Sequence, residues 1–399
     1  MHPLRLVPFR WLVTGQTING LGNAIAPIAL AFAVLDLGGT ATELGLVVAA
    51  YAAADVIAVL WGGVYGDRLP RRVLMVGANA CAALTQAVVA WSLIAGWSSL
   101  TLLAVLGAVN GALGALAGPA TSAVLPQTVP ALSLAKAISW RRLSSNVAYV
   151  IGFGLAGVLV AAFGSGGALV IDSATFAIAA TCFWFVRVEH EPSAERHSFL
   201  AEARAGLSET MRHTWLWTVI LMATAYHLFF GGAQGVLGPI VVGEEFGRAA
   251  WGYAMSATMV GFVVGGLVTL VWKPRKLLLV GQIMLCLTAL FPAAMAAGGH
   301  AWVVYLGSAL YGFGLEIFSV QWDLAIMQNV PDHLLARVTS VDMIGSFAVR
   351  PLGLVLTGPM AAVFGNRGWL WIVAAALLAI ELAPLFLRDV RRLERKSHD

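Results

Sequence analysis

Four charged residues interrupt long apolar stretches of this sequence: Asp55, Glu316, Asp323 and Arg350. A charged side chain at the centre of a lipid bilayer costs about 2.5–3.5 kcal/mol on insertion scales, so such residues usually face a partner or a water-filled cavity. Counting from the ends of the stretches places Asp55, Glu316 and Arg350 at similar depth. We therefore expect these residues to form ion pairs or to handle protons or other cations.

Glu316 and Asp323 are seven residues apart and would point roughly the same way from one helix. Their shared face is the strongest candidate for proton or cation handling. In this hypothesis one of the two carboxyl groups takes up a proton outside the cell and releases it inside. A permanently paired, structural role is the alternative and stays open.

Other polar residues within the apolar stretches could line a cavity. They are Gln16, Asn19, Asn23, Asn146, Tyr149, His227 and Gln234, with the aromatic residues Trp140, Phe229 and Trp322. A membrane histidine such as His227 can titrate near neutral pH. An ordinary interhelical hydrogen bond is the favoured interpretation of this histidine.

The elements that must position these residues follow from composition. Hydrophobic residues make up 59% of the chain, charged residues only 11%, and the mean hydropathy is +0.84. Continuous apolar runs of about 20 residues cross a bilayer as helices, whereas barrel strands alternate in polarity. We expect an all-α membrane protein with about twelve crossings, at 8–35, 43–65, 73–96, 99–124, 138–162, 168–187, 214–242, 250–272, 277–297, 301–328, 338–363 and 368–387.

The sequence repeats itself at a separation of about 200 residues. Residues 62–77 are echoed by 265–281. Five further residues recur 201 positions later: Gly111, Pro130, Leu134, Ala135 and Ser139 match Gly312, Pro331, Leu335, Ala336 and Ser340. Duplicated halves are common in transporters. The repeat predicts two pseudo-symmetric six-helix bundles, 1–187 and 214–399, joined by a cytoplasmic linker, 188–213, whose amphipathic part would lie along the membrane face.

Basic residues gather in the turns on one side of the expected crossings. They are Arg68, Arg71, Arg72, Lys136, Arg141, Arg142, Lys273, Arg275, Lys276 and Arg337. By the positive-inside rule this side is cytoplasmic, together with the linker, both termini and a short C-terminal tail. The formal net charge of +4 therefore reflects the basic turns on the cytoplasmic side of the membrane. It does not imply a nucleic-acid partner.

The turn after the second expected crossing carries a recognisable motif. Residues 63–72, GVYGDRLPRR, resemble the G-x-x-x-D-R-x-G-R-R turn of the major facilitator superfamily, with Pro70 at the usual glycine position. The resemblance implies a gating turn made by Gly63, Asp67, Arg68, Arg71 and Arg72. A plain positive-inside anchor is the alternative interpretation, but it leaves Asp67 unexplained.

Further stretches are similar to the macrolide-efflux and enterobactin-exporter branch of this superfamily. They include Gly118-Pro119, residues 134–137, residues 328–332 and 337–342, and Arg350-Pro351. In the superfamily, helices 2 and 11 touch between the halves. The resemblance therefore implies an ion pair between Asp55 and Arg350 that differs between the inward-open and outward-open states.

The resemblance implies a secondary active transporter that works by alternating access. We expect export of a small amphipathic or hydrophobic compound, such as a drug, an antibiotic or a siderophore-like metabolite, from a bacterial cell, by antiport against protons. A uniporter or importer of a small metabolite is the serious alternative. No cofactor is expected beyond the proton gradient, and the partners would be the substrate and the bilayer, with the protein a monomer.

Other classes find little support in the sequence. G-x-S-x-G and H-E-x-x-H motifs are absent, which argues against a membrane-embedded enzyme, and the lack of a Walker element argues against ATP-driven transport. Cys81, Cys182 and Cys286 lie within apolar stretches without metal-ligand spacing and are interpreted as small core residues.

Overall fold

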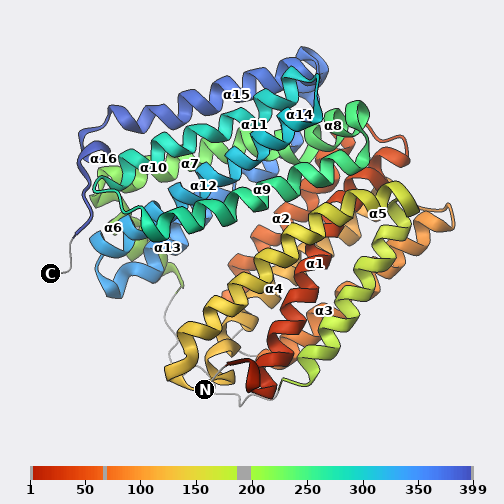
Figure 1. Cartoon of the computed structure of the whole chain (residues 1–399), viewed down its shortest axis with the longest axis horizontal. Helices are drawn as coiled ribbons and strands as arrows, with labels where there is room; N and C mark the ends of the chain where they lie inside the picture. The colour runs from red at the N-terminus through yellow and green to blue at the C-terminus, as the bar shows by residue number, and fades with distance from the viewer. Residues whose placement is uncertain (1–2, 66–69, 187–198, 397–399) are drawn as a thin grey trace. The chain divides into compact units, whose positions relative to one another are not determined.

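The computed structural model describes residues 3–65, 70–186 and 199–396, with the backbone alone described for 60–65 and 199–203. Figure 1 shows the course of the chain. Within the described ranges the regular structure is helical, apart from one antiparallel bridge between Lys276 and Glu394. The chain divides into two compact units, which we call unit 1 (1–194 with 246–256) and unit 2 (195–245 with 257–399).

Unit 1 is built from long helices in sequence order. They are α1 (Val7–Asp36), α2 (Ala41–Tyr65), α3 (Arg71–Ile94), α4 (Leu100–Val124) and α5 (Leu134–Trp184), with the short 3-10 helices η1 (Pro3–Arg5), η3 (Leu125–Thr128) and η4 (Ala131–Ser133). Local sequence sets several of the helix starts. At the start of α2, the Thr40 hydroxyl accepts from the Glu43 backbone N–H at 3.3 Å, and the Glu43 carboxylate accepts from the Thr40 backbone N–H at 2.8 Å. This reciprocal pattern is a capping box.

The long element α5 is two helices in one. Gly164 has φ 72° and ψ 171°, outside the helical region, and this left-handed φ is readily adopted only by glycine. The chain reverses there, so residues 134–163 and 165–184 form two antiparallel arms. This reversal places the expected crossings 138–162 and 168–187 within a single labelled element.

Unit 2 has more interrupted helices. They are α6 (Phe199–Arg212), α7 (Thr214–Gly232), α8 (Gly238–Phe246), α9 (Arg248–Val271), α10 (Leu277–Leu285), α11 (Leu290–Ala297), α12 (Ala301–Asn329), α13 (Asp332–Phe347), α14 (Arg350–Phe364), α15 (Asn366–Leu382) and α16 (Arg388–Arg392). A π-helical turn, η5 (Ala233–Leu237), joins α7 to α8, and the 3-10 segments η6 (Cys286–Ala289) and η7 (Ala383–Phe386) follow α10 and α15. The first turns of α9 group with unit 1 and the remainder with unit 2.

The described residues contain eleven segments long and apolar enough to cross a membrane. One of them, Ala131–Trp184, holds both arms of α5, so these segments provide twelve crossings, six in each half of the sequence. The all-α fold and the number of crossings are confirmed. Large apolar side chains such as Leu84 (68% exposed), Trp91 (64%) and Leu270 (71%) cover the outward surfaces, as expected for helices that face lipid.

The two units share a packing device at positions 201 residues apart. A Cβ atom on Gly111 of α4 would lie 2.3 Å from the backbone oxygen of Tyr51 on α2. A Cβ on Gly312 of α12 would lie 2.1 Å from the backbone oxygen of Thr258 on α9. Both glycines therefore let the fourth crossing of their half lie directly against the second, as small residues do in membrane helix pairs. The repeat in the sequence is thus a repeat in packing.

Replacing Gly111 or Gly312 by alanine is expected to destabilise the protein, because the backbone carbonyls that the new Cβ would meet cannot move aside as side chains can. Overpacking costs about 1–3 kcal/mol, and contact with backbone puts these sites at the upper end. Thermal unfolding of purified variants would measure the loss. Gly118→Ala in α4 is the matched control, because a Cβ there meets nothing within 4 Å. Equal melting temperatures for all three variants would contradict this account.

Candidate functional site

A ladder of amide side chains links α1 to α3 in unit 1 and runs from the exposed Asn23 to the buried Asn79. Asn23 donates to Asn19 one turn earlier on α1, Asn19 donates to Asn79 on α3, and Asn79 donates to the backbone oxygen of Met75 at 2.7 Å. Tyr149 of α5 also interacts with Asn23. The structure therefore brings together three predicted cavity residues, Asn19, Asn23 and Tyr149, and adds Asn79, which the sequence analysis missed.

The remaining predicted cavity residues of unit 1 are placed separately. Gln16 lies on α1 with its side-chain oxygen buried and without a hydrogen bond to the described residues. Asn146 and Trp140 are exposed on α5. Buried polar atoms normally have hydrogen-bond partners. The side-chain oxygen of Gln16 therefore adds a polar group on the helix that also carries Asn19 and Asn23.

Asp55 lies half-buried on α2, where α4 packs closest. A Cβ on Gly111 would lie 3.3 Å from the backbone nitrogen of Asp55, and the corresponding atom beside Gly312 belongs to Phe262. The close helix packing therefore occurs in both halves, whereas the residue at this contact is charged only in the first half. The predicted partner, Arg350, is in unit 2, so the ion pair stays a prediction.

Arg350 stands at a break in its crossing. Helix α13 ends at Phe347, and α14 begins at Arg350, followed by Pro351, which has no N–H to continue the earlier helix. The Arg350 side chain packs on α7, where its Cγ lies 3.1 Å from a Cβ placed on Gly231. Its charge also interacts with His227 and with Tyr311 of α12.

His227 makes its hydrogen bond within its own helix. The Nδ1–H donates to the backbone oxygen of Ala223 at 2.8 Å, and the ring lies 4.2 Å from the ring of Phe347. The hydrogen bond that the structure gives Nδ1 is therefore intrahelical, and the expected interhelical bond stays a prediction. The carbonyl four residues earlier is always within reach of a helical side chain, whereas a partner on another helix must be supplied by packing.

Glu316 and Asp323 lie on α12 with different neighbours. Glu316 is half-buried against Gly265 and Gly266 of α9, and its Oε1 lies 3.5 Å from a Cβ placed on Gly266. Asp323 is exposed and interacts electrostatically with Asp342 of α13. Asp342 in turn accepts from the Trp322 Nε1–H at 3.0 Å and from the Ser346 hydroxyl at 3.1 Å. A second carboxyl group thus joins Asp323, which the sequence analysis did not anticipate.

The other predicted cavity residues of unit 2 lie on α7, on the turn that follows it and on α12. Gln234 is half-buried in the π-helical turn η5, an irregularity often found at functional sites. Phe229 lies 6.2 Å from Trp369 between ring centres. Trp322 packs edge-on against Trp215 at 5.8 Å.

The gating turn is described only in part. Asp67 and Arg68 lie outside the described residues, and of Gly63 only its place in α2 is described. Arg71 donates to the backbone oxygen of Ala123 at 3.0 Å, in the last turn of α4. Arg72 donates to the backbone oxygen of Trp184, the last residue of α5, and its guanidinium lies 4.6 Å above that ring. Both arginines therefore complement helix C-termini, which a plain membrane anchor does not require.

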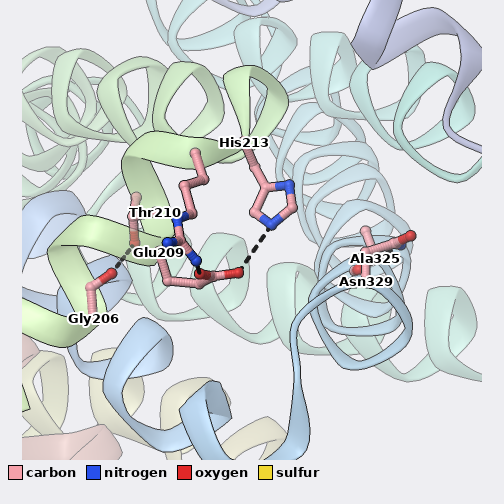
Figure 2. Close-up of polar contacts among 7 residues, drawn as sticks. Gly206, Glu209, Thr210, His213, Ala325 and Asn329 are labelled. Carbon is pink, nitrogen blue, oxygen red and sulfur yellow. Dashed lines mark hydrogen bonds and ion pairs between the residues drawn. The ribbon is translucent and has the colours of Figure 1, made fainter.

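The linker helix α6 packs against α13. A Cβ on Gly206 would lie 2.6 Å from the backbone oxygen of Arg337. Figure 2 shows the buried Glu209 of this helix, which accepts from Arg212 at 3.1 Å and lies 3.2 Å from the Nε2 of His213. These polar contacts lie within the linker helix and the residue that follows it, whereas the contact of Gly206 with Arg337 joins the helix to α13.

An ion pair that the sequence analysis missed lies at the C-terminal end of α1. Asp36 pairs with Arg248, the first residue of α9, and also accepts from the Ser165 hydroxyl at 2.6 Å. The Arg248 guanidinium lies 5.2 Å from the Phe32 ring centre. All four residues belong to unit 1. The contact fastens the start of α9 to α1 and to the second arm of α5.

Breaking this ion pair is expected to have a small effect, because both side chains are about one-third exposed (32% and 37%). Surface pairs contribute about 0.2–1 kcal/mol in double-mutant cycles. Asp36→Asn and Arg248→Gln should each lower the melting temperature slightly, and the double variant should lose no more than the worse single. Strictly additive losses would show that the two groups act independently. Added salt should reduce the coupling.

Comparisons with known proteins show likeness over most of the chain. The model of the Major Facilitator Superfamily matches residues 12–341. The multidrug efflux pump Tap of Mycolicibacterium fortuitum is 25% identical, over 99% of this chain and 98% of Tap. Macrolide efflux protein A of Streptococcus pyogenes is 21% identical, over 97% and 98% of the two chains. The crystal structure of the nucleoside transporter NupG has a TM-score of 0.75 at 11% identity, over 95% and 98%, which is a likeness of fold alone.

Proposed function

Since this chain belongs to the major facilitator superfamily, we propose that it exports a small amphipathic or hydrophobic compound by alternating access. Membership makes the protein a membrane transporter and not an enzyme, and it confirms the resemblance noted in the sequence. Direction, coupling and substrate class are the proposed part.

The observation that carries the proposal is the end-to-end likeness to efflux proteins. Tap and macrolide efflux protein A each match at least 97% of this chain, so both halves of the transporter take part in the likeness. The amide ladder of unit 1 supports a polar wall that can satisfy hydrogen-bonding groups of an otherwise apolar compound. A macrolide or another amphipathic antibiotic fits this description, as does a siderophore-like metabolite.

The proposed driving force is the proton gradient, with no cofactor. Glu316, half-buried beside Gly265 and Gly266, and Asp323, beside Asp342, are the proposed coupling groups. Carboxyl groups within membrane crossings are the usual proton carriers of pumps and transporters. Helix breaks such as the one before Arg350 resemble the discontinuous helices at transporter sites.

The proposed setting is the inner membrane of a bacterium, with both termini, the linker and the gating turn on the cytoplasmic side. The basic turns support this orientation through the positive-inside rule. The proposed domains are the two six-helix halves, 1–187 and 214–399. We propose a monomer whose partners are its substrate and the bilayer, without nucleic acid.

Growth protection and flux measurements test the proposal together. The chain would be expressed in a bacterial host lacking its own drug pumps and challenged with a panel that includes macrolides, tetracyclines and cationic dyes. Export is supported if protected cells accumulate less of the compound and if collapsing the proton gradient restores accumulation. A control with empty vector sets the baseline.

A uniporter or importer gives the opposite pattern. In proteoliposomes, a uniporter equilibrates the compound at the same rate with and without an imposed pH gradient, and an importer sensitises cells instead of protecting them. Either result would overturn coupled export. Cysteine labelling of the linker and of the C-terminal tail tests the orientation, since both should react from the cytoplasmic side.

A further inference from the structure

The sixth crossing of unit 2 carries a fully buried carboxyl group. Glu381 of α15 is 0% exposed. Its Oε1 accepts a hydrogen bond from the Thr288 hydroxyl of η6, and its Oε2 is buried without a hydrogen bond to the described residues. A carboxylate left with one such bond in an apolar interior is costly, whereas a carboxyl that has bound a proton is neutral.

Within the described ranges, no positively charged side chain contacts Glu381. Of the elements that pack against α15, the described parts of α10, α11, η5 and η7 hold no titratable side chain. Glu381 interacts electrostatically with Tyr226 of α7 and Cys286 of η6. The basic groups of α7 and α14, His227 and Arg350, interact with each other instead. Glu381 therefore has hydroxyl and thiol neighbours in place of a counterion.

A line of hydroxyl groups leads away from this carboxyl. Thr288 is hydrogen-bonded to Glu381, and the buried Tyr226 hydroxyl interacts with Thr288 and with Tyr311 of α12, although its geometry in this state makes no full hydrogen bond. Tyr311 also senses the charge of Arg350. The ring of Phe230 stacks on the rings of Tyr226 and Tyr311, with ring centres 5.2 and 4.7 Å apart.

The backbone beside this line is also irregular. Thr288 belongs to a 3-10 segment that interrupts its crossing between α10 and α11. Interrupted helices in transporters lie where ions bind, because freed backbone groups need polar partners there. Geometry, burial and helix irregularity thus coincide at one place.

We propose that Glu381 is a proton-binding site inside unit 2, loaded through the hydroxyls of Tyr311, Tyr226 and Thr288. A carboxylate oxygen gains the proton to form an O–H group, and release of the proton restores the carboxylate. The site is separate from Glu316 and Asp323. The role of Glu381 in transport rests on the proposed proton-coupled export. Its ability to bind a proton does not depend on that proposal.

Infrared difference spectroscopy on the purified full-length protein tests protonation directly, since a protonated carboxyl has a carbonyl stretch that a carboxylate lacks. Spectra would be compared between acid and alkaline buffers. Glu381→Gln is expected to remove one buried carboxyl band and to fold, because glutamine has the shape of the neutral acid. Glu244→Gln, at an exposed glutamate of α8, is the matched control and should leave that band. Asp172 of unit 1 is also 0% exposed and is expected to give a separate carboxyl band. The variant Asp172→Asn would identify that band.

The outcomes separate this inference from the proposed function. If Glu381→Gln, folded by thermal unfolding, retains every buried carboxyl band, the proton site is overturned. In proteoliposomes with labelled erythromycin as the probe, Glu381→Gln should keep exchange of external for internal compound and lose export driven by a pH gradient. Wild-type rates in both assays would overturn its part in coupling.

Two further variants test the relay. Tyr226→Phe and Tyr311→Phe should slow pH-driven export while leaving the infrared band in place, and unchanged rates would remove the hydroxyls from the path. If the wild-type protein moves no erythromycin under any gradient, the proposed function fails for that compound. The infrared result still decides whether Glu381 binds a proton.

Discussion

Replacing Glu316 by glutamine and Asp323 by asparagine in one protein is expected to reduce pH-driven export to the rate of empty proteoliposomes. An antiporter can use a proton gradient only through groups that gain and lose the proton during the cycle, and amides cannot. The effect is measured as the flux of labelled substrate in proteoliposomes with an imposed pH gradient. Exchange of substrate without a gradient should survive, because it needs no net proton movement.

The single variants divide the roles of the two carboxyls. Glu316 is half-buried against α9, whereas Asp323 is exposed and has Asp342 nearby to share its task. Glu316→Gln should therefore cause the larger loss. Asp332→Asn, at an exposed carboxyl at the start of α13, is the matched control and should export normally. Wild-type export by the double variant would remove both residues from the coupling mechanism.

The second large effect is expected at Asp55 and Arg350. If they pair during the transport cycle, Asp55→Asn or Arg350→Gln removes that interaction in the state where it forms. Each single variant should then lose most of its transport. The charge-reversed protein, Asp55→Arg with Arg350→Asp, should regain a measurable part of it.

The test compares the substrate flux of the wild-type protein, the two single variants and the charge-reversed protein. Expression and melting temperature are measured for each. Recovery on charge reversal requires direct interaction, since two independent defects would only add. A reversed protein as inactive as the worse single variant argues against the pair. Arg350 would then be assigned to its observed neighbours, Gly231, His227 and Tyr311.

The sequence predicted the helices well because membrane crossings are decided by composition over about 20 residues. The spans 8–35 and 301–328, for example, became Val7–Asp36 and Ala301–Asn329. Breaks within crossings were not predicted. The π-helical turn after Gly232 and the 3-10 segment at Cys286 lie in continuous apolar sequence, where hydropathy carries no information about hydrogen-bond register.

Pairings across the fold were the weakest part of the prediction. Asp36 and Arg248 are 212 residues apart, and nothing in either local sequence names the other. Asn79 completes a ladder begun by two asparagines on α1, yet alone it is one more polar residue in an apolar run. Glu381 could have been found, since it is a carboxyl within the predicted span 368–387. Only packing shows that Thr288 and Tyr226 surround it.

Residues 246–256, which comprise the end of α8, Gly247 and the first turns of α9, complete a unit otherwise made from the N-terminal half of the chain. Gly157 of α5 and Gly252 of α9 meet backbone to backbone there, and the Ser256 hydroxyl donates to the Val150 oxygen at 2.8 Å. The first 194 residues by themselves would lack this segment and would leave the backbone at Gly157 uncovered, so the N-terminal half depends on the C-terminal half to complete its packing.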